Sequence, residues 1–254
     1  MKVSFVYKRD LESIKLKEQL IETLTYEIDE ENPDIVFTIG GDGTVLDAIR
    51  KYKHILEDVL FVTIHTGNLG FYTEFLPNQL DDVFELLSKN NPSVKTYPLI
   101  AFSYDGEEEI ALNELTLSDQ HRVFNAEVYV DDLFLMHVRG NGVCVASPTG
   151  STAYNKSLGG AVMDSDMNAL QMTVIAPFQT AKSRMISPLV FSKHRTITIK
   201  PQTRYLDITF DRMIISKENV KEVTINLSDK RVRFLSNDTL KFANRIFEKF
   251  IGEI

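Results

Sequence analysis

The first 91 residues alternate strand-like with helix-like patterns, and this alternation constrains the fold more than any other feature of the sequence. The segments are, in order, a strand pattern at 2–7, a helix at 11–24, a strand at 34–39, a helix at 45–52, a strand at 59–66 and a helix at 79–88. Strands and helices in alternation build parallel β/α units. We therefore predict an α/β N-terminal domain over residues 1–95.

The rest of the chain has a different pattern. The segment "NNPSVKTYP" at residues 90–98 contains two prolines and breaks the alternation, so we place a domain boundary there. Short strand patterns then follow one another, which predicts a β-rich C-terminal domain over residues 96–236. The patterns are "LIAFSY", "ALNELTLS", "AEVYVDDLFLMHV", "GVCVAS", "LQMTVIA", "RTITIK", "YLDITF", "EVTINLS" and "RVRFLS".

Two local features of this half and one at the chain end add detail. Asp131 and Asp132 separate two alternating runs, which indicates a tight hairpin turn. The acidic run at residues 107–109 is typical of a solvated hairpin tip. The segment 237–254 has helical apolar spacing, so we expect a helix that docks on another part of the protein. Its apolar residues are Ala243, Ile246, Phe247, Phe250 and Ile251.

Composition and charge restrict the class of partner. The formal charge of −8 and a pI near 5.2 argue against binding to nucleic acid or to an anionic membrane, so we expect a small-molecule partner. Cys144 is the single cysteine, and the N-terminal residues lack a signal-peptide layout, so we expect a cytoplasmic protein. No apolar run is long enough to span a bilayer. The five histidines show no metal-ligand spacing, so we expect no protein-held metal.

The segment "GGDGT" at residues 40–44 carries the first chemical signal. A strand, a glycine loop and a helix start would gather backbone N–H groups at the carboxyl edge of a parallel sheet, where phosphate oxygens bind. The loop is neither a P-loop nor G-x-G-x-x-G. Asp42 would then accept a proton from an incoming hydroxyl or help to hold Mg²⁺. The alternative is that Asp42 only caps the following helix.

Two further segments carry polar groups. The segment "SPTGSTAYNKSLGG" at residues 147–160 combines a tight turn with hydroxyls at a helix start, which would suit a flat polar ligand such as adenine; the alternative is an ordinary capped helix. Asn113 and Glu114 are neighbours in a strand pattern, and one of such a pair usually faces solvent.

Taken together, these segments resemble the NAD kinase family. The resemblance rests on "GGDGT", on "HTGNLGF" at residues 65–71, on Asn113 and Glu114, on "SPTGSTAYNKSLGG" and on "ISPL" at residues 186–189. It covers nearly the whole chain. "GGDGT" alone also occurs in diacylglycerol, sphingosine-type and 6-phosphofructo-kinases, whereas "PTGSTAY" downstream of "NE" is far more specific.

The resemblance implies transfer of the γ-phosphate of ATP, or in some members of inorganic polyphosphate, to the 2′-hydroxyl of the adenosine ribose of NAD. It implies Asp42 as the catalytic proton acceptor, Mg²⁺ or another divalent cation bound with ATP, and a homodimer or homotetramer that binds NAD across a subunit contact. It also implies that the C-terminal helix packs back on the first domain. The nucleotide-binding residues that it implies are Gly40, Gly41, Gly43, Thr44, Phe71, Tyr72, Asn113, Glu114, Arg139, Asn141, Thr152, Ala153, Tyr154, Asn155, Lys156, Ser157, Ala176, Phe178 and Arg212.

Two positions depart from the family pattern. Many relatives have an aspartate where this chain has Asn141, and a neutral or weakly basic residue where it has Arg212. Two other functions remain as alternatives: a lipid kinase that shares the glycine loop, and an NAD-binding regulator without turnover. The lipid kinase would not need "NE" or "PTGSTAY", and the intact Asp42 disfavours the regulator.

Overall fold

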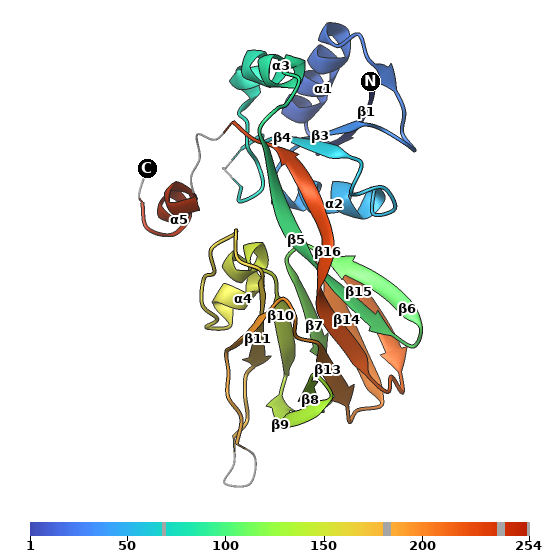
Figure 1. The fold of residues 1–254 in the computed structure, drawn as a ribbon, viewed down its shortest axis with the longest axis vertical. Coiled ribbons are helices and arrows are strands. Elements are labelled where there is room, and N and C mark those ends of the chain that lie inside the picture. Colours follow the sequence, from blue (N-terminus) through green and yellow to red (C-terminus); the bar gives the residue numbers. More distant parts are fainter. Residues whose placement is uncertain (68–69, 180–183, 238–241, 253–254) are drawn as a thin grey trace. The chain divides into compact units, whose positions relative to one another are not determined.

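The computed structural model describes residues 1–67, 70–179, 184–237 and 242–252 (Figure 1). The chain divides into two compact units, which are described separately. The first unit comprises Met1–Thr96 and Lys230–Ile254, and the second comprises Tyr97–Asp229.

The first unit contains a parallel sheet with the order β2-β1-β3-β4-β16. Its strands are β1 (Lys2–Tyr7), β2 (Glu27–Ile28), β3 (Ile35–Ile39), β4 (Leu60–Ile64) and the C-terminal part of β16 (Val223–Leu235). Tyr7 pairs with Ile39, and Ile39 pairs with Ile64. The three central strands therefore end in register, and the loops that follow them meet at one edge of the sheet.

Helices cover both faces of this sheet. The helical segments are α1 (Leu11–Thr23), α2 (Asp42–Lys51), the 3₁₀ turn η1 (Pro77–Gln79), α3 (Leu80–Ser88) and α5 (Phe242–Phe250). Helices α1 and α3 share one apolar core with alternate strand residues such as Val3 and Phe5. Ser4 lies between these two and faces the other side, where its hydroxyl accepts a hydrogen bond from Tyr52 at the end of α2.

The second unit is built from two antiparallel sheets. One has the order β12-β11-β10-β7-β14-β15; in the other, β16, β13, β8 and β9 pair in sequence, and β5 pairs with β16 and β6. Buried residues of both sheets form a single apolar core. The elements are β5 (Val94–Tyr104), β6 (Glu107–Ala111), β7 (Glu114–Ser118), β8 (Phe124–Val130), β9 (Leu133–Gly140), β10 (Gly142–Ala146), the 3₁₀ turn η2 (Thr149–Thr152), α4 (Tyr154–Ser157), β11 (Ala169–Ile175), β12 (Leu189–Ser192), β13 (Ile197–Pro201), β14 (Tyr205–Phe210) and β15 (Met213–Glu218).

The predicted fold class is confirmed: an α/β N-terminal domain, a β-rich C-terminal domain and a C-terminal helix that returns to the first. The predicted hairpin turn is also confirmed, because Asp131 and Asp132 join β8 to β9 with φ angles of 50° and 66°. Within the described residues, no helix is long and apolar enough to cross a membrane.

The proline-containing segment runs into β5, which contains Pro98 and pairs with β6 from Ile100 onward. Several local predictions were wrong. The acidic run lies in β6 rather than at a hairpin tip, since the turn is made by Asp105 and Gly106. "EVTINLS" and "RVRFLS" form the single strand β16, and β2, β12 and β15 were not predicted.

The C-terminal helix is present as predicted, but not all of its apolar residues are buried. The apolar spacing predicts an apolar contact face, yet Phe247 and Ile251 are 56% and 69% exposed. Arg245 is instead the buried residue of α5, at 4% exposure. A charged side chain therefore connects this helix to the first unit.

Candidate active site

The glycine loop follows β3 and lies beside the loop that follows β4. The backbone N–H of Gly40 donates to the carbonyl oxygen of Ile64 at 2.9 Å, which ties the two loops together at the carboxyl edge of the sheet. Helix α2 begins at Asp42, three residues earlier than predicted, with Gly41 as its N-cap. Gly41, Gly43 and Thr44 are half-buried, so the first turn of this helix remains accessible.

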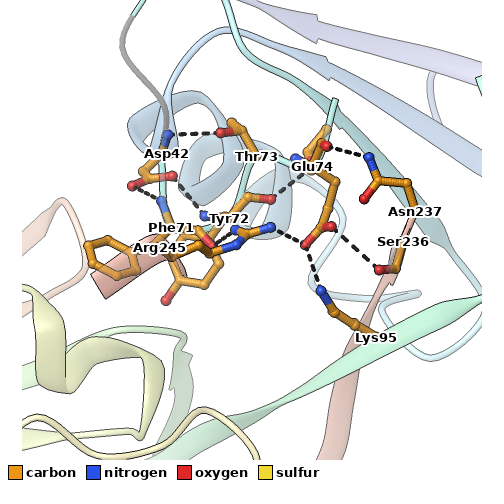
Figure 2. A network of polar contacts seen from close by, with 11 residues as sticks. Asp42, Phe71, Tyr72, Thr73, Glu74, Lys95, Ser236, Asn237 and Arg245 are labelled. Carbon is orange, nitrogen blue, oxygen red and sulfur yellow. Dashed lines mark hydrogen bonds and ion pairs between the residues drawn. The ribbon is translucent and has the colours of Figure 1, made fainter. Parts of the chain in front are cut away.

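Asp42 is held by the neighbouring loop rather than by its own helix. Its Oδ2 accepts the backbone N–H of Phe71 at 2.9 Å, and its Oδ1 accepts that of Tyr72 at 3.0 Å (Figure 2). No side chain caps α2, so the interpretation of Asp42 as a helix cap was wrong. A Cβ on Gly70 would lie 2.1 Å from Asp42 Oδ1, so this position requires glycine. The carboxylate is fixed in place and retains lone pairs for a further donor.

The two aromatic residues that hold Asp42 differ in exposure. Tyr72 is buried, with its ring stacked on Phe234 at a centroid distance of 6.1 Å. Phe71 is half-buried, and its ring lies 5.6 Å from that of Phe250 on α5. Phe71 is therefore the more accessible of the two side chains beside the glycine loop.

A buried polar network continues from this loop, and sequence reasoning missed it (Figure 2). Arg245 donates to the carbonyl oxygen of Phe71 and pairs with Glu74, whose side chain is 0% exposed. Lys95 Nζ lies 3.6 Å from the same carboxylate, and Ser236 donates to it at 3.4 Å. Burial raises the pKa of Glu74, while Arg245 and Lys95 oppose that rise. The apolar residues around Arg245 mask this role in the sequence.

Lys8 is a second residue that sequence reasoning missed. It follows β1 at the same sheet edge, and its Cβ lies 3.4 Å from the point where a Cβ on Gly40 would stand. Its ammonium group pairs with Asp10 at 2.9 Å and is mostly exposed. The glycine loop contains no lysine of its own, and Lys8 is a cationic residue whose backbone and Cβ lie beside it while its ammonium group rests on Asp10. The signal that could have identified Lys8 in the sequence was its position directly after the predicted strand at residues 2–7.

In the second unit, a buried turn fixes the backbone of Asn113. Asp211, between β14 and β15, accepts the N–H of Leu112 at 2.9 Å and that of Asn113 at 2.7 Å. The carbonyl oxygen of Asn113 accepts the N–H of Ser147 at 2.9 Å, and a Cβ on Gly150 would lie 1.8 Å from that oxygen. The "NE" and "SPTG" segments are therefore packed against each other.

Glu114 has an unusual environment. Its Oε2 is buried and has no hydrogen-bond partner among the described residues. Burial, and secondly the carboxylate of Asp211, raise the pKa of Glu114 to about 8, while the backbone N–H of Tyr154 opposes the rise. A buried acceptor without a donor is costly, so this carboxyl group is suited to a ligand hydroxyl.

Several hydroxyl groups of the "SPTGSTAYNKS" segment form hydrogen bonds inside the protein. Ser151 donates to the carbonyl of Pro148 at 2.6 Å, and Thr152 donates to that of Thr149 at 2.8 Å. These hydroxyls stabilise the turn, which differs from the expectation that they face a ligand. Asn155 is buried and accepts from Thr173 at 2.7 Å. The accessible residues of the segment are Ala153, Tyr154, Lys156 and Ser157.

The structure also brings together Arg139 and Phe178, which lie in two segments that the resemblance implies as nucleotide-binding. The N–H of Phe178 donates to the carbonyl of Arg139 at 2.8 Å, and the guanidinium of Arg139 lies 5.2 Å from the ring centroid of Phe178. The N–H of Asn141 donates to Ile175 at 2.8 Å. Asn141, Phe178 and Ala176 are exposed.

The residues predicted from the sequence thus form three groups. One lies in the first unit around Asp42, and two lie in the second unit, around Glu114 and around Arg139. Arg212 follows Asp211 directly and is exposed, so it lies beside the Glu114 group. Within the described ranges, no three His, Cys, Asp or Glu side chains form a group that could hold a metal ion. Cys144 is buried, and burial raises the pKa of its thiol.

An α/β unit with a carboxylate fixed in a glycine loop, joined to a β-rich unit with a buried carboxyl group, defines a two-domain phosphate-binding protein. The family model of the ATP-NAD kinase N-terminal domain matches residues 3–91, and that of the ATP-NAD kinase C-terminal domain matches residues 112–236. The chain belongs to the NAD kinase family, which confirms the resemblance seen in its motifs.

Individual relatives agree over the full length. The NAD kinase of Lactobacillus johnsonii is 39% identical over 265 residues, which cover 100% of this chain and 98% of that protein. The NAD kinase of Enterococcus faecalis is 36% identical over 265 residues and 100% of both chains.

Solved structures agree in fold. The crystal structure of an NAD kinase from Archaeoglobus fulgidus in complex with ATP has a TM-score of 0.77 and 26% identity, over 94% of each chain. Yeast NADH kinase complexed with NADH has a TM-score of 0.86 and 18% identity, over 100% of this chain and 89% of that one, and is similar in fold.

Proposed function

We infer that this protein is an NAD kinase, which transfers the γ-phosphate of ATP to the 2′-hydroxyl of the adenosine ribose of NAD and so forms NADP. Family membership over both domains and the full-length relatives support the activity. The observation that carries the assignment is Asp42, a half-buried carboxylate held by two backbone N–H groups at the carboxyl edge of a parallel sheet.

In this proposal, Asp42 accepts the proton of the ribose hydroxyl as that oxygen attacks phosphorus. The fixed carboxylate needs little rearrangement to do so. Gly40, Gly41 and Gly43 allow the phosphate chain to approach the backbone, and the first turn of α2 offers N–H groups to its oxygens. Lys8 lies beside the loop, and its ammonium group, which pairs with Asp10 in this structure, would turn to the phosphates. Phosphoryl transfer depends mainly on such positioning and electrostatics.

Mg²⁺, or another divalent cation, would enter with the nucleotide. The glycine loop offers one carboxylate, Asp42, and Mg²⁺ commonly binds substrate phosphates with only one or two protein carboxylates. When bound, the cation neutralises charge on the phosphates. Equilibrium dialysis should find no tight stoichiometric Mg²⁺ binding without nucleotide, and tight binding would contradict this part of the proposal.

The second unit would bind the dinucleotide. The unpartnered Oε2 of Glu114 fits a ribose hydroxyl, and Asn113 precedes it on a backbone fixed by Asp211. Residues 152–157 would contact the adenosine half, chiefly through Ala153, Tyr154, Lys156 and Ser157. Arg139, Asn141, Ala176 and Phe178 would contribute near the nicotinamide end. Phe71 and Tyr72 would border the dinucleotide, with Phe71 as the accessible side chain.

We also propose that the protein self-associates as a homodimer or homotetramer and acts in the cytoplasm. Leu133 and Leu135, which share one face of β9, are 74% and 43% exposed, and they would suit contact with a second copy. Light scattering after gel filtration should give two or four times the mass of 29.0 kDa. A monomer at micromolar concentration would contradict the self-association.

One assay tests the central proposal. The protein, ATP, Mg²⁺ and NAD are incubated, and NADP is measured with an NADP-specific dehydrogenase. We expect NADP to accumulate with time and enzyme concentration. Replacing ATP by polyphosphate tests the second donor. NAD binding without any NADP would favour the non-catalytic regulator, and phosphorylation of a diacylglycerol without NADP formation would favour the lipid kinase.

A further inference from the structure

Arg245 connects the C-terminal helix to the loop that holds Asp42. Its Nη1 donates to the carbonyl oxygen of Phe71, and its Nη2 pairs with Glu74. Figure 2 shows the guanidinium lying between these two acceptors. Phe71 also donates its own N–H to Asp42 at 2.9 Å. The backbone of this residue is therefore held on both sides, by the carboxylate at its N–H and by the arginine at its carbonyl.

The anchor of Arg245 is itself fixed. The side chains of Arg245 and Glu74 are 4% and 0% exposed. Besides Arg245, the carboxylate of Glu74 has Lys95 at 3.6 Å and Ser236 at 3.4 Å. Its backbone carbonyl accepts from Asn237 at 3.2 Å. Lys95 on β5 and the two residues that follow β16 therefore hold Glu74, and Glu74 holds the guanidinium.

Stability alone is a weak reason for such a pair. Desolvation of two buried charges offsets most of their attraction, and an apolar pair of similar volume is often as stable. What the pair provides is geometry, because a guanidinium presents its donors in a rigid planar fork. Nη2 of the guanidinium binds the carboxylate of Glu74 and Nη1 binds the carbonyl oxygen of Phe71, so the guanidinium sets the distance between these two acceptors.

The geometry matters at Asp42. A general base acts only within about 2.6–3.2 Å of the group that it deprotonates, and a misplacement of about 1 Å can cost roughly 10²-fold in rate. The N–H groups of Phe71 and Tyr72 set the place of the carboxylate. Any rotation of the Phe71 backbone would therefore move the base.

We propose that Arg245, anchored by Glu74, is a positioning residue for phosphoryl transfer: it orients the Phe71 backbone and thereby the carboxylate of Asp42. The inference rests on the proposed function and deepens it. It differs from a role in docking α5 alone, which would lower stability without a selective loss of kcat.

The test uses the full-length protein carrying E74Q and R245M together, so that neither buried charge is left without its partner. We expect kcat to fall roughly 10- to 100-fold, while the Kd for NAD stays within about threefold because no proposed NAD contact is removed. Asn244→Ala is the matched control, since Asn244 is the exposed neighbour on the same helix. It should behave like the wild type.

The variant Arg245→Lys keeps the charge opposite Glu74 but lacks the fork, so its kcat should also fall while its melting temperature stays close to the wild type. If the variant that carries both E74Q and R245M does not fold, Arg245→Lys tests the proposal by itself. A wild-type kcat in the folded paired variant, or in R245K, would overturn the proposal. So would a raised KM for NAD at unchanged kcat.

A second measurement separates positioning from a general loosening of the structure. In an Asp42→Ala background, E74Q with R245M should change the residual rate by less than about twofold, because the base that they position is gone. If E74Q with R245M lowered the rate in the Asp42→Ala background by as large a factor as in the wild-type background, the proposal would be overturned. The proposed function fails separately, if the wild-type protein forms no NADP at all.

Discussion

Asp42 Oδ2 accepts the backbone N–H of Phe71 at 2.9 Å, which joins two loops that are 29 residues apart in the sequence. One loop follows β3 and the other follows β4, and the two strands are parallel neighbours in register. The carboxylate in the glycine loop is thus fixed by the adjoining strand's loop, at the sheet edge where phosphate ligands bind in α/β folds.

Asp211 should be needed for the shape of the NAD site. Asp211→Ala removes the acceptor for two backbone N–H groups, those of Leu112 and Asn113, and should destabilise the protein by about 2 kcal/mol while weakening NAD binding. Thermal unfolding and titration calorimetry measure the two effects. Asp207→Ala is the control, because Asp207 on the same unit accepts from the Ser216 hydroxyl. Equal effects of the two variants on NAD binding would contradict this role.

Glu114 should make stability depend on pH. Its pKa is raised from 4.5 to about 8 in the folded protein, so between these values the folded protein retains a proton that the unfolded chain releases. Stability should therefore fall as pH rises through that window. Glu114→Gln removes this dependence.

The measurement is the melting temperature of the variant minus that of the wild type. We expect this difference to be more positive near pH ~8.5 than near pH ~5, by at least roughly 2–4 °C, which corresponds to about 1 kcal/mol in a protein of this size. A difference that is constant with pH, or that becomes more negative as pH rises, would contradict the assignment.

Lys8 should contribute to ATP binding. Lys8→Met removes the ammonium group of a residue that lies beside the glycine loop and should raise the KM for ATP about 5- to 10-fold, or roughly 1 kcal/mol, with little change in the KM for NAD. Lys15→Met is the matched control, since Lys15 is exposed on α1 of the same unit. The effect of Lys8→Met should also weaken at high salt. An unchanged KM for ATP would exclude this role.

Asn141 should bind NAD by hydrogen bonding without charge. Its side chain is exposed, while its backbone is fixed to Ile175 at 2.8 Å. Asn141→Ala should therefore leave the fold intact and weaken NAD binding by about 1 kcal/mol, the usual value of one hydrogen bond. Calorimetric titration with NAD measures this change, and an identical dissociation constant would argue against the placement.

The sequence predicted the parts of the fold that depend on local periodicity. The strand, glycine loop and helix around Asp42 were found because buried strands and amphipathic helices have distinct periods. The hairpin at Asp131 was found from its turn residues. The long strand β16 was read as two, because its polar middle at residues 228–231 resembles a turn.

The hydrogen-bond and ion-pair partners of the site residues could not be predicted from the sequence. The contact of Asp42 with Phe71, and that of Glu74 with Arg245 171 residues away, depend on how distant segments pack. Likewise, the hydroxyl groups of Ser151 and Thr152 could not be assigned inward or outward from their spacing. The resemblance to NAD kinases identified Asp42, Phe71 and Thr152 but neither Glu74 nor Arg245, and the structure supplied the contacts.

The most direct test of the whole account is the variant Asp42→Asn. Asparagine keeps the size of the side chain, but it presents one acceptor oxygen and one NH₂ group where two N–H donors point, so one hydrogen bond is lost. This loss should lower stability by about 1 kcal/mol, which thermal unfolding measures as a control.

The deciding measurement is kcat for NADP formation by Asp42→Asn at saturating ATP and NAD, beside the Kd for NAD. Removal of the proton acceptor should lower kcat by roughly 10²- to 10⁴-fold, while NAD binding stays within a few fold of the wild type. A folded variant that forms NADP at nearly the wild-type kcat would contradict the assignment of Asp42 as the base.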